Sequence, residues 1–142
     1  MPIFWREKMS VQNALIDRDH RYLICLINTV ELALRDPEDR QPINNALMQL
    51  RDYTREHFRN EEQIQAAIGF PTHSEHKRLH ESLTRSLEEL IARAQTEGDA
   101  ATQQERNSDL ITLLRDWLLH HVLQEDLLMA PYLRQYPENF TG

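Results

Sequence analysis

Seven side chains that could bind metal recur along this 142-residue chain at spacings typical of helices. They are five histidines and two carboxylates: His20, His57, Glu61, His76, His80, His121 and Asp126. Residues four apart lie about 40° from each other around a helix, so His57 and Glu61 can reach a common point, as can His76 and His80. His121 and Asp126 are five apart, or about 140° on an ideal α-helix. Spacing alone does not favour their convergence.

This mixture of imidazoles and carboxylates predicts a centre with two metal ions. A buried, ionised carboxylate costs several kcal/mol unless a cation or strong donors compensate it, and neutral imidazoles would leave Glu61 and Asp126 poorly satisfied. Seven ligands are too many for a four-coordinate structural zinc ion and too rich in nitrogen for magnesium or calcium. Two ions bridged by carboxylates would use all seven. Oxygen and imidazole donors suit iron, manganese or cobalt, and a redox function would favour iron.

Three segments rich in helix breakers divide the chain into long pieces, at 35–42, 68–72 and 96–102. We expect helices at about 17–35, 41–66, 73–96 and 103–129, with Asp17 capping the first. An N-terminal arm would precede them, and a short C-terminal tail with Pro131 and Pro137 would follow. Connections this short make consecutive helices antiparallel. The sequence therefore predicts a single all-α domain over 1–142, an up-down-up-down four-helix bundle.

Apolar stripes place the candidate ligands inside this bundle. Steps of three and four along the second helix give Ile43, Leu47, Leu50, Thr54, His57, Glu61, Ile64 and Ile68. The corresponding stripe of the fourth helix contains Leu110, Leu114, Trp117, His121 and Leu128. In an antiparallel bundle, the starts of the first and third helices meet the ends of the second and fourth. All seven candidates are therefore expected at one end of the bundle.

Composition excludes several classes of partner. The chain has 23 acidic and 16 basic side chains, and the resulting charge of −7 would repel nucleic acid and anionic lipid. The N-terminal sequence has no continuous apolar segment, and no run approaches the length needed to span a bilayer, so we expect a cytoplasmic protein. The single cysteine, Cys25, allows no internal disulfide and is expected to be a small core residue among leucines and isoleucines.

The ordered motifs resemble those of the hemerythrin family, in particular its single-domain bacterial members, the bacteriohemerythrins. The resemblance covers nearly the whole chain. It rests on His20 with IDRDH at 16–20, HFRNE at 57–61, HKRLH at 76–80 and HVLQED at 121–126. Trp5, GFP at 69–71 and WLLHH at 117–121 add to it. Arg18 and Asp19 depart from the usual residues before the first histidine, and we expect them to alter the rim of the site rather than its ligands.

The resemblance implies how the ligands are divided between two iron ions, Fe2+ or Fe3+. One iron would be held by three histidines and the other by two, leaving an open position for dioxygen on the second. Glu61 and Asp126 would bridge both ions, together with a solvent-derived oxo or hydroxo group. The three histidines are His76, His80 and His121, and the two are His20 and His57. Helical phase suggests a dry pocket lined by Leu23, Ile24, Trp117 and Leu118.

The resemblance favours an oxygen-binding protein over an enzyme. Reversible binding of dioxygen for transport, storage or sensing is the leading interpretation. A di-iron enzyme acting on nitric oxide or peroxide, or assisting repair of iron–sulfur clusters, is the alternative, and a metal-handling or partner-binding module is a third. The remaining polar candidates receive ordinary interpretations. We expect His73 and His120 to face solvent or support the ligands, and Glu62 and Glu125 to be solvated.

Overall fold

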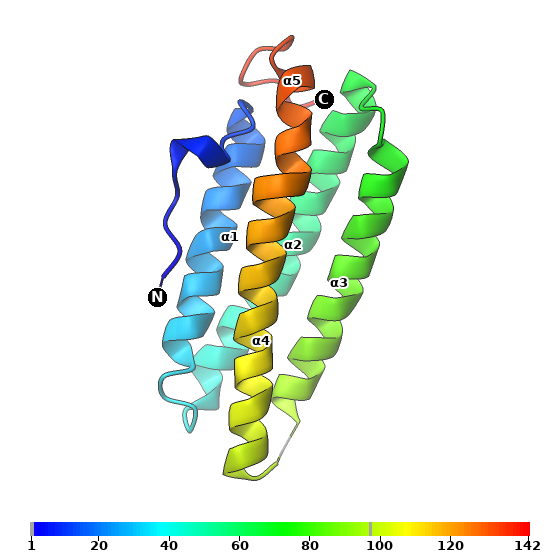
Figure 1. Cartoon of the computed structure of the whole chain (residues 1–142). Helices are drawn as coiled ribbons and strands as arrows, with labels where there is room; N and C mark the ends of the chain where they lie inside the picture. Colours follow the sequence, from blue (N-terminus) through cyan, green and yellow to red (C-terminus); the bar gives the residue numbers. More distant parts are fainter. Residues whose placement is uncertain (1, 97) are drawn as a thin grey trace.

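The chain folds into a bundle of four long helices that run antiparallel to their neighbours in sequence (Figure 1). The computed structural model describes residues 2–96 and 98–142, and no strand occurs among them. The long helices are α1 (Ala14–Ala33), α2 (Arg40–Ile68), α3 (His73–Gln95) and α4 (Ala100–His120). Shorter turns are η1 (Glu7–Met9), η2 (His121–Glu125), η3 (Asp126–Met129) and α5 (Ala130–Leu133). The predicted all-α bundle is confirmed.

The first helix begins earlier than predicted, because its cap is Asn13 rather than Asp17. The side chain of Asn13 accepts a hydrogen bond from the backbone N–H of Ile16 at 3.1 Å, as an N-cap residue does. Asp17 lies one turn inside α1 and instead accepts the backbone N–H of Val11 at 2.9 Å and the hydroxyl of Ser10 at 2.5 Å. The carboxylate therefore ties the N-terminal arm to the start of α1.

The turn between α2 and α3 depends on Gly69. Its backbone is left-handed, with φ 64° and ψ 41°, a conformation that glycine adopts without strain at a helix C-terminus. The N–H of Phe70 then bonds to the carbonyl of Gln65 at 2.9 Å, and the Phe70 side chain is buried. This turn directs the chain back along the bundle, so that α3 begins beside the end of α2.

Helical backbone continues beyond the end of α4 as far as Leu133, but its number of residues per turn changes on the way. The sequence pattern did not predict this change. After His120 the backbone passes through one π-helical turn, η2, and a 3-10 turn, η3, before α5. A π turn holds about one residue more than an α turn, so the apolar stripe shifts by one position. Leu128, which the stripe predicted to be buried, is 58% exposed, whereas Met129 and Leu133 are buried. Pro131 lies within α5 rather than in the tail.

Two apolar clusters fill the bundle, one on either side of the candidate ligands. The smaller lies at the end of the bundle near the C-terminus and contains Val11, Ile16, Ile64, Phe70, Met129 and Leu133. The larger extends along the rest of the core and includes Leu23, Ile24, Phe58, Trp117 and Leu118. On α1, His20 lies between Ile16 of the smaller cluster and Leu23 of the larger, and beyond α4 both His121 and Asp126 lie between Leu118 and Met129. The polar site is therefore enclosed by apolar side chains above and below.

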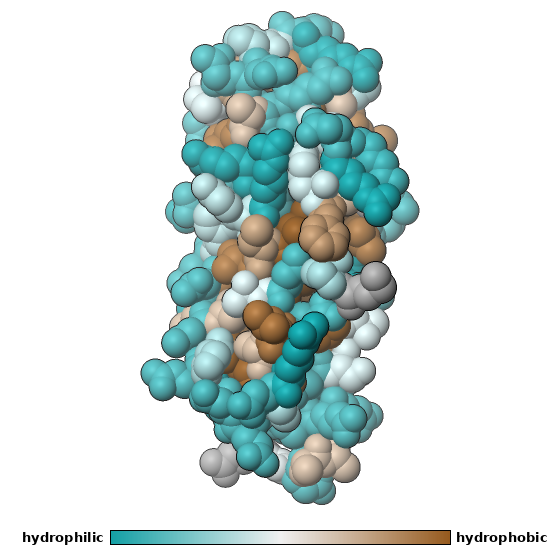
Figure 2. All heavy atoms as spheres, turned by 90° about the vertical axis from the view of Figure 1, so that its left-hand side faces the viewer, coloured by the Kyte–Doolittle hydropathy of each residue, from teal (hydrophilic) through white to brown (hydrophobic). Residues whose placement is uncertain are grey.

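The outer face of α1 carries apolar side chains at its surface. Figure 2 shows hydrophobic atoms near the middle of the face formed by the arm and α1, and Phe4, Tyr22 and Leu32 are among the exposed apolar residues. Cys25 is also exposed, so its prediction as a core residue is wrong. It lies on the outer side of α1, about 160° around the helix from the fully buried Ile27. No helix in the described part of the chain is long and apolar enough to cross a membrane.

Candidate metal centre

The structure brings all seven predicted ligand side chains together in the interior. They come from α1, α2, α3 and the two turns that follow α4, and none is more than 4% exposed. Their nitrogen and oxygen atoms form two overlapping groups in which all donor atoms lie within 4.8 Å of one another. Glu61 and Asp126 belong to both groups. The first adds His76, His80 and His121, and the second adds His20 and His57.

Each oxygen of Glu61 faces a different group of imidazoles. Oε1 lies 2.7 Å from Nε2 of His76 and 3.2 Å from Nε2 of His80. Oε2 lies 3.1 Å from Nε2 of His57 and 3.8 Å from Nε2 of His20. The carboxylate thus stands between the two groups and offers one oxygen to each.

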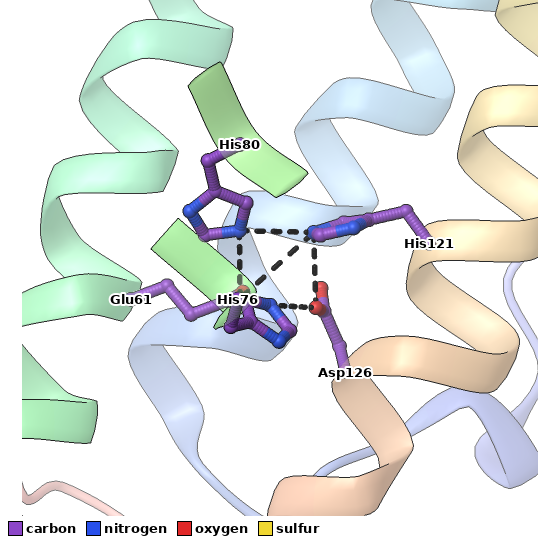
Figure 3. Close-up of side chains that lie close together, drawn as sticks. All are labelled: Glu61, His76, His80, His121 and Asp126. Atoms are coloured by element: carbon purple, nitrogen blue, oxygen red, sulfur yellow. Dashed lines mark hydrogen bonds and ion pairs between the residues drawn. The ribbon is translucent and has the colours of Figure 1, made fainter. Parts of the chain in front are cut away.

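The two oxygens of Asp126 also face different groups of imidazoles, from the opposite side of the site. Its Oδ1 lies 3.0 Å from Nε2 of both His76 and His121 (Figure 3), and its Oδ2 lies 2.9 Å from Nε2 of His20. The π turn makes this arrangement possible, because its hydrogen bonds join residues five apart and hold His121 and Asp126 on the same face. The five-residue spacing that argued against Asp126 in an α-helix therefore favours it here.

The two buried carboxylates are ionised and therefore require positive charge nearby. Burial opposes the ionisation of Glu61, but the four surrounding imidazoles hold its pKa well below the usual value. For Asp126, burial and the nearby charge of Glu61 oppose ionisation, yet His121 and His20 still lower its pKa. Burial also disfavours charged His57 and His76, but their carboxylate partners raise each pKa to about 10.

The donor set fits metal ions better than it fits hydrogen bonds among its own members. Nε2 of His80 and Nε2 of His121 face each other at 3.2 Å, so at most one of them can direct a proton into this contact. Nε2 of His57 and Oε2 of Glu61 are buried, and neither makes a hydrogen bond of good geometry in the described structure. A cation within each group would satisfy these atoms, because imidazole and carboxylate together suit first-row transition metals.

Comparison with known proteins agrees with this geometry. The family model described as the hemerythrin HHE cation binding domain matches residues 12–133, a range that contains all seven side chains. The chain belongs to the hemerythrin family. A bacteriohemerythrin of Stenotrophomonas maltophilia is 26% identical over 139 residues, covering 98% of this chain and 86% of that protein. A bacteriohemerythrin of Pseudomonas paraeruginosa is 27% identical over 87% of this chain and 76% of its own length. A hemerythrin-like protein of Naegleria gruberi is 25% identical over 89% of each chain.

Two carboxylates next to candidate ligands in this hemerythrin-family chain have contacts that sequence reasoning missed. Glu62 was expected to be solvated, but its Oε1 lies 3.2 Å from Nδ1 of His80 and its side chain is only 21% exposed. Asp19 was expected at the rim, but it is 1% exposed and lies 3.2 Å from Nδ1 of His57. Arg18, in contrast, is exposed. Both carboxylates therefore contact candidate ligands on the ring nitrogen that faces away from the centre.

The four side chains that were predicted to line a dry pocket are all buried. Leu23, Ile24, Trp117 and Leu118 are buried in the larger cluster. Phe58, which sequence reasoning did not single out, stacks on His80 with ring centroids 3.9 Å apart and an interplanar angle of 7°. It directly follows His57 in the HFRNE motif and also meets the edge of His121.

The two histidines outside the predicted set lie outside both groups. Nδ1 of His73 is 3.1 Å from Oε1 of the buried Gln65, whose amide nitrogen is 3.3 Å from Sδ of Met129. His73 is thus partly buried and helps to hold the end of α2. His120 is exposed, with its Nε2 3.5 Å from Oε1 of Glu125. Glu125 is consequently paired at the surface rather than only solvated.

Proposed function

We propose that this hemerythrin-family chain binds dioxygen reversibly at two iron ions held by the seven clustered side chains. The observation that carries the proposal is the overlap of two donor groups that share both carboxylates. Shared carboxylates are the natural bridge between two like-charged ions, since each oxygen can bind one of them. A solvent-derived oxo or hydroxo bridge is part of the same proposal.

The unequal number of imidazoles supports a place for a small ligand. The first group contains three histidines and the second two, so an ion in the second group would have one protein ligand fewer. Iron bound there would supply electrons that dioxygen can accept and return. His20 and His57 would hold this ion, while Glu61 and Asp126 would tie it to its neighbour.

The chain's own contribution is to hold the donors rigidly and to exclude water. Candidate ligands come from every long segment of the bundle, and the apolar clusters on both sides leave them almost without exposure. Exclusion of water and of small anions slows the irreversible oxidation that would end reversible binding. Transport, storage and sensing share these requirements, and the proposal covers all three. A cytoplasmic location stays a prediction from the sequence.

An enzymatic role is the alternative function, with nitric oxide, peroxide or damaged iron–sulfur clusters as substrates. Several relatives bear the name bacteriohemerythrin, and the predominance of histidine in the site differs from the carboxylate-rich sites of di-iron enzymes that activate dioxygen. Both observations favour binding over catalysis.

An optical experiment tests the proposal directly. Iron-loaded protein is reduced without oxygen, exposed to air, and then flushed with argon while its spectrum is recorded. Reversible binding predicts a ligand-to-iron charge-transfer band that appears in air and disappears under argon over repeated cycles. Prompt conversion to an oxidised spectrum that argon does not reverse would refute carriage of dioxygen and favour the enzymatic alternative.

Replacing Phe58 by Ala should shorten the lifetime of the oxygenated protein. The ring stacks on His80, and both side chains line a surface groove together with Arg55, Arg59, Glu62 and other residues of α2 and α3. Removing the ring would widen the groove next to His80 and so give water easier access to the site, and it would cost about 3–5 kcal/mol of stability through the lost packing. We expect irreversible oxidation to become several-fold faster in air at a temperature where the variant stays folded. Phe4→Ala, at a position 69% exposed, is the control and should leave the rate unchanged.

A further inference from the structure

Asp19 is a buried carboxylate with an unusually complete set of partners. Its Oδ2 lies 3.2 Å from Nδ1 of His57 and accepts a hydrogen bond from the amide of Asn60 at 3.1 Å. Its Oδ1 accepts the hydroxyl hydrogen bond of Tyr53 at 2.9 Å. All three partners come from α2, so Asp19 joins the start of α1 to the helix that carries His57 and Glu61.

The contact determines which nitrogen of His57 faces the centre. An ionised carboxylate can only accept hydrogen bonds, so the imidazole nitrogen next to Asp19 must carry the proton. When the ring is neutral, as a metal ligand must be, Nε2 keeps its lone pair, and this nitrogen points at Glu61, 3.1 Å from Oε2. Ligand histidines in metalloproteins are commonly oriented in this way by an acceptor on the far nitrogen.

His57 is anchored more firmly than the other imidazole in its group. Nδ1 of His20 is buried and has no hydrogen-bond partner in the described structure. Of the two histidines expected beside the open position, only His57 therefore has a carboxylate at Nδ1, the ring nitrogen that faces away from the centre. Tyr53 and Asn60 fix that carboxylate in turn, which limits its freedom to turn away from the ring.

We propose that Asp19, held by Tyr53 and Asn60, is a positioning residue that fixes His57 and thereby retains the metal ion in the two-histidine group. The inference rests on the proposed function, because it assigns His57 to an ion. On the other group, Glu62 occupies the corresponding place at Nδ1 of His80, but with greater exposure. The two carboxylates therefore act on different ions.

Binding of zinc provides the test, because Zn2+ is diamagnetic and does not react with dioxygen. The affinities of the two zinc ions are measured by competition with a chelator in wild-type protein and in Asp19→Ala and Glu62→Ala variants. Loss of a carboxylate that orients a ligand typically lowers metal affinity 10- to 100-fold. We expect Asp19→Ala to weaken one ion by this factor and Glu62→Ala to weaken the other. Asp52→Ala, on the exposed side of α2, should change neither.

Nitrogen NMR of the histidine rings separates positioning from a general effect on stability. In zinc-loaded wild-type protein, His57 should show a protonated Nδ1, and Asp19→Ala should alter this signal without altering that of His80. Asp19→Asn keeps an oxygen that can accept the Nδ1 proton and should restore most of the affinity and the signal. If Asp19→Ala fails to fold, Asp19→Asn still provides a test, because its uncharged oxygen is a weaker acceptor and should lower the affinity for one ion slightly while the helical content stays unchanged.

Unchanged affinity for both ions in folded Asp19→Ala, or an Nδ1 of His57 without a proton in the wild type, would overturn the inference. Failure of the proposed function gives a different result. In that case the wild type would bind two zinc ions with the expected dependence on Asp19, while its iron form would show no reversible spectrum in air. Wild-type protein that holds fewer than two zinc ions would overturn both.

Discussion

Glu61→Gln should lower the iron content from about two ions per chain to less than one, the largest effect expected from a single substitution. Both donor groups contain Glu61, and each of its oxygens lies close to imidazoles of a different group. The amide has the same shape but lacks the charge, and only one of its two terminal atoms can bind a cation. The measurement is iron per chain after reconstitution and desalting.

Two further variants test whether iron is lost because Glu61 no longer connects the two donor groups. Glu56→Gln makes the same change on the exposed side of α2 and should keep both ions. His20→Ala removes a member of the two-histidine group only, and it should cost one ion and retain the other. If Glu61→Gln retained two irons per chain, Glu61 would not connect the two groups and the dinuclear assignment would fail.

Much of this site could be predicted because periodicity and chain direction act together. His57 and Glu61 occupy positions of an apolar stripe, and short loops force α3 to begin beside the end of α2. These two constraints place His76 and His80 opposite them without any knowledge of the side-chain conformations. The same reasoning predicted that the candidates gather at one end of the bundle.

The end of the fourth helix could not be predicted, because its period changes inside the site. Stepping by an α-helical repeat from His121 leads to Leu128, which is exposed, whereas the π turn leads to Asp126 and Met129. Nothing in HVLQED distinguishes this turn from an ordinary α-helix by propensity. The resemblance to hemerythrins supplied Asp126, and the structure supplies the physical reason for its position.

Supporting carboxylates were missed for another reason. A charged residue beside a ligand in sequence points about 100° away from it on the same helix, which suggests solvent. In a four-helix bundle that direction can instead lead to a neighbouring helix, and Asp19 reaches His57 in this way. Cys25 shows the opposite error, because apolar neighbours in sequence suggested burial although its phase on α1 places it outside. The identity of the facing helix, and not local composition, decides both positions.

Removal of metal should lower the melting temperature by more than about 15 °C. Each ion present at a thousand times its dissociation constant adds about 4 kcal/mol to the free energy of unfolding, and in a chain of this size 1 kcal/mol shifts the melting temperature by about 2–4 °C. Without metal, the site keeps two buried carboxylates and five imidazoles that cannot all satisfy one another. The metal-free chain should nevertheless stay helical, because both apolar clusters remain intact.

Thermal unfolding followed by circular dichroism, before and after chelation, provides the measurement, and Glu61→Gln provides the control. Since that variant should hold little metal, chelation should scarcely change its melting temperature, and the wild type without metal should melt near it. An equal fall in both proteins would mean that the chelator acts elsewhere. An unchanged melting temperature in the wild type would mean that no ion stabilises the fold, and the clustered carboxylates would then need protonated imidazoles as their partners.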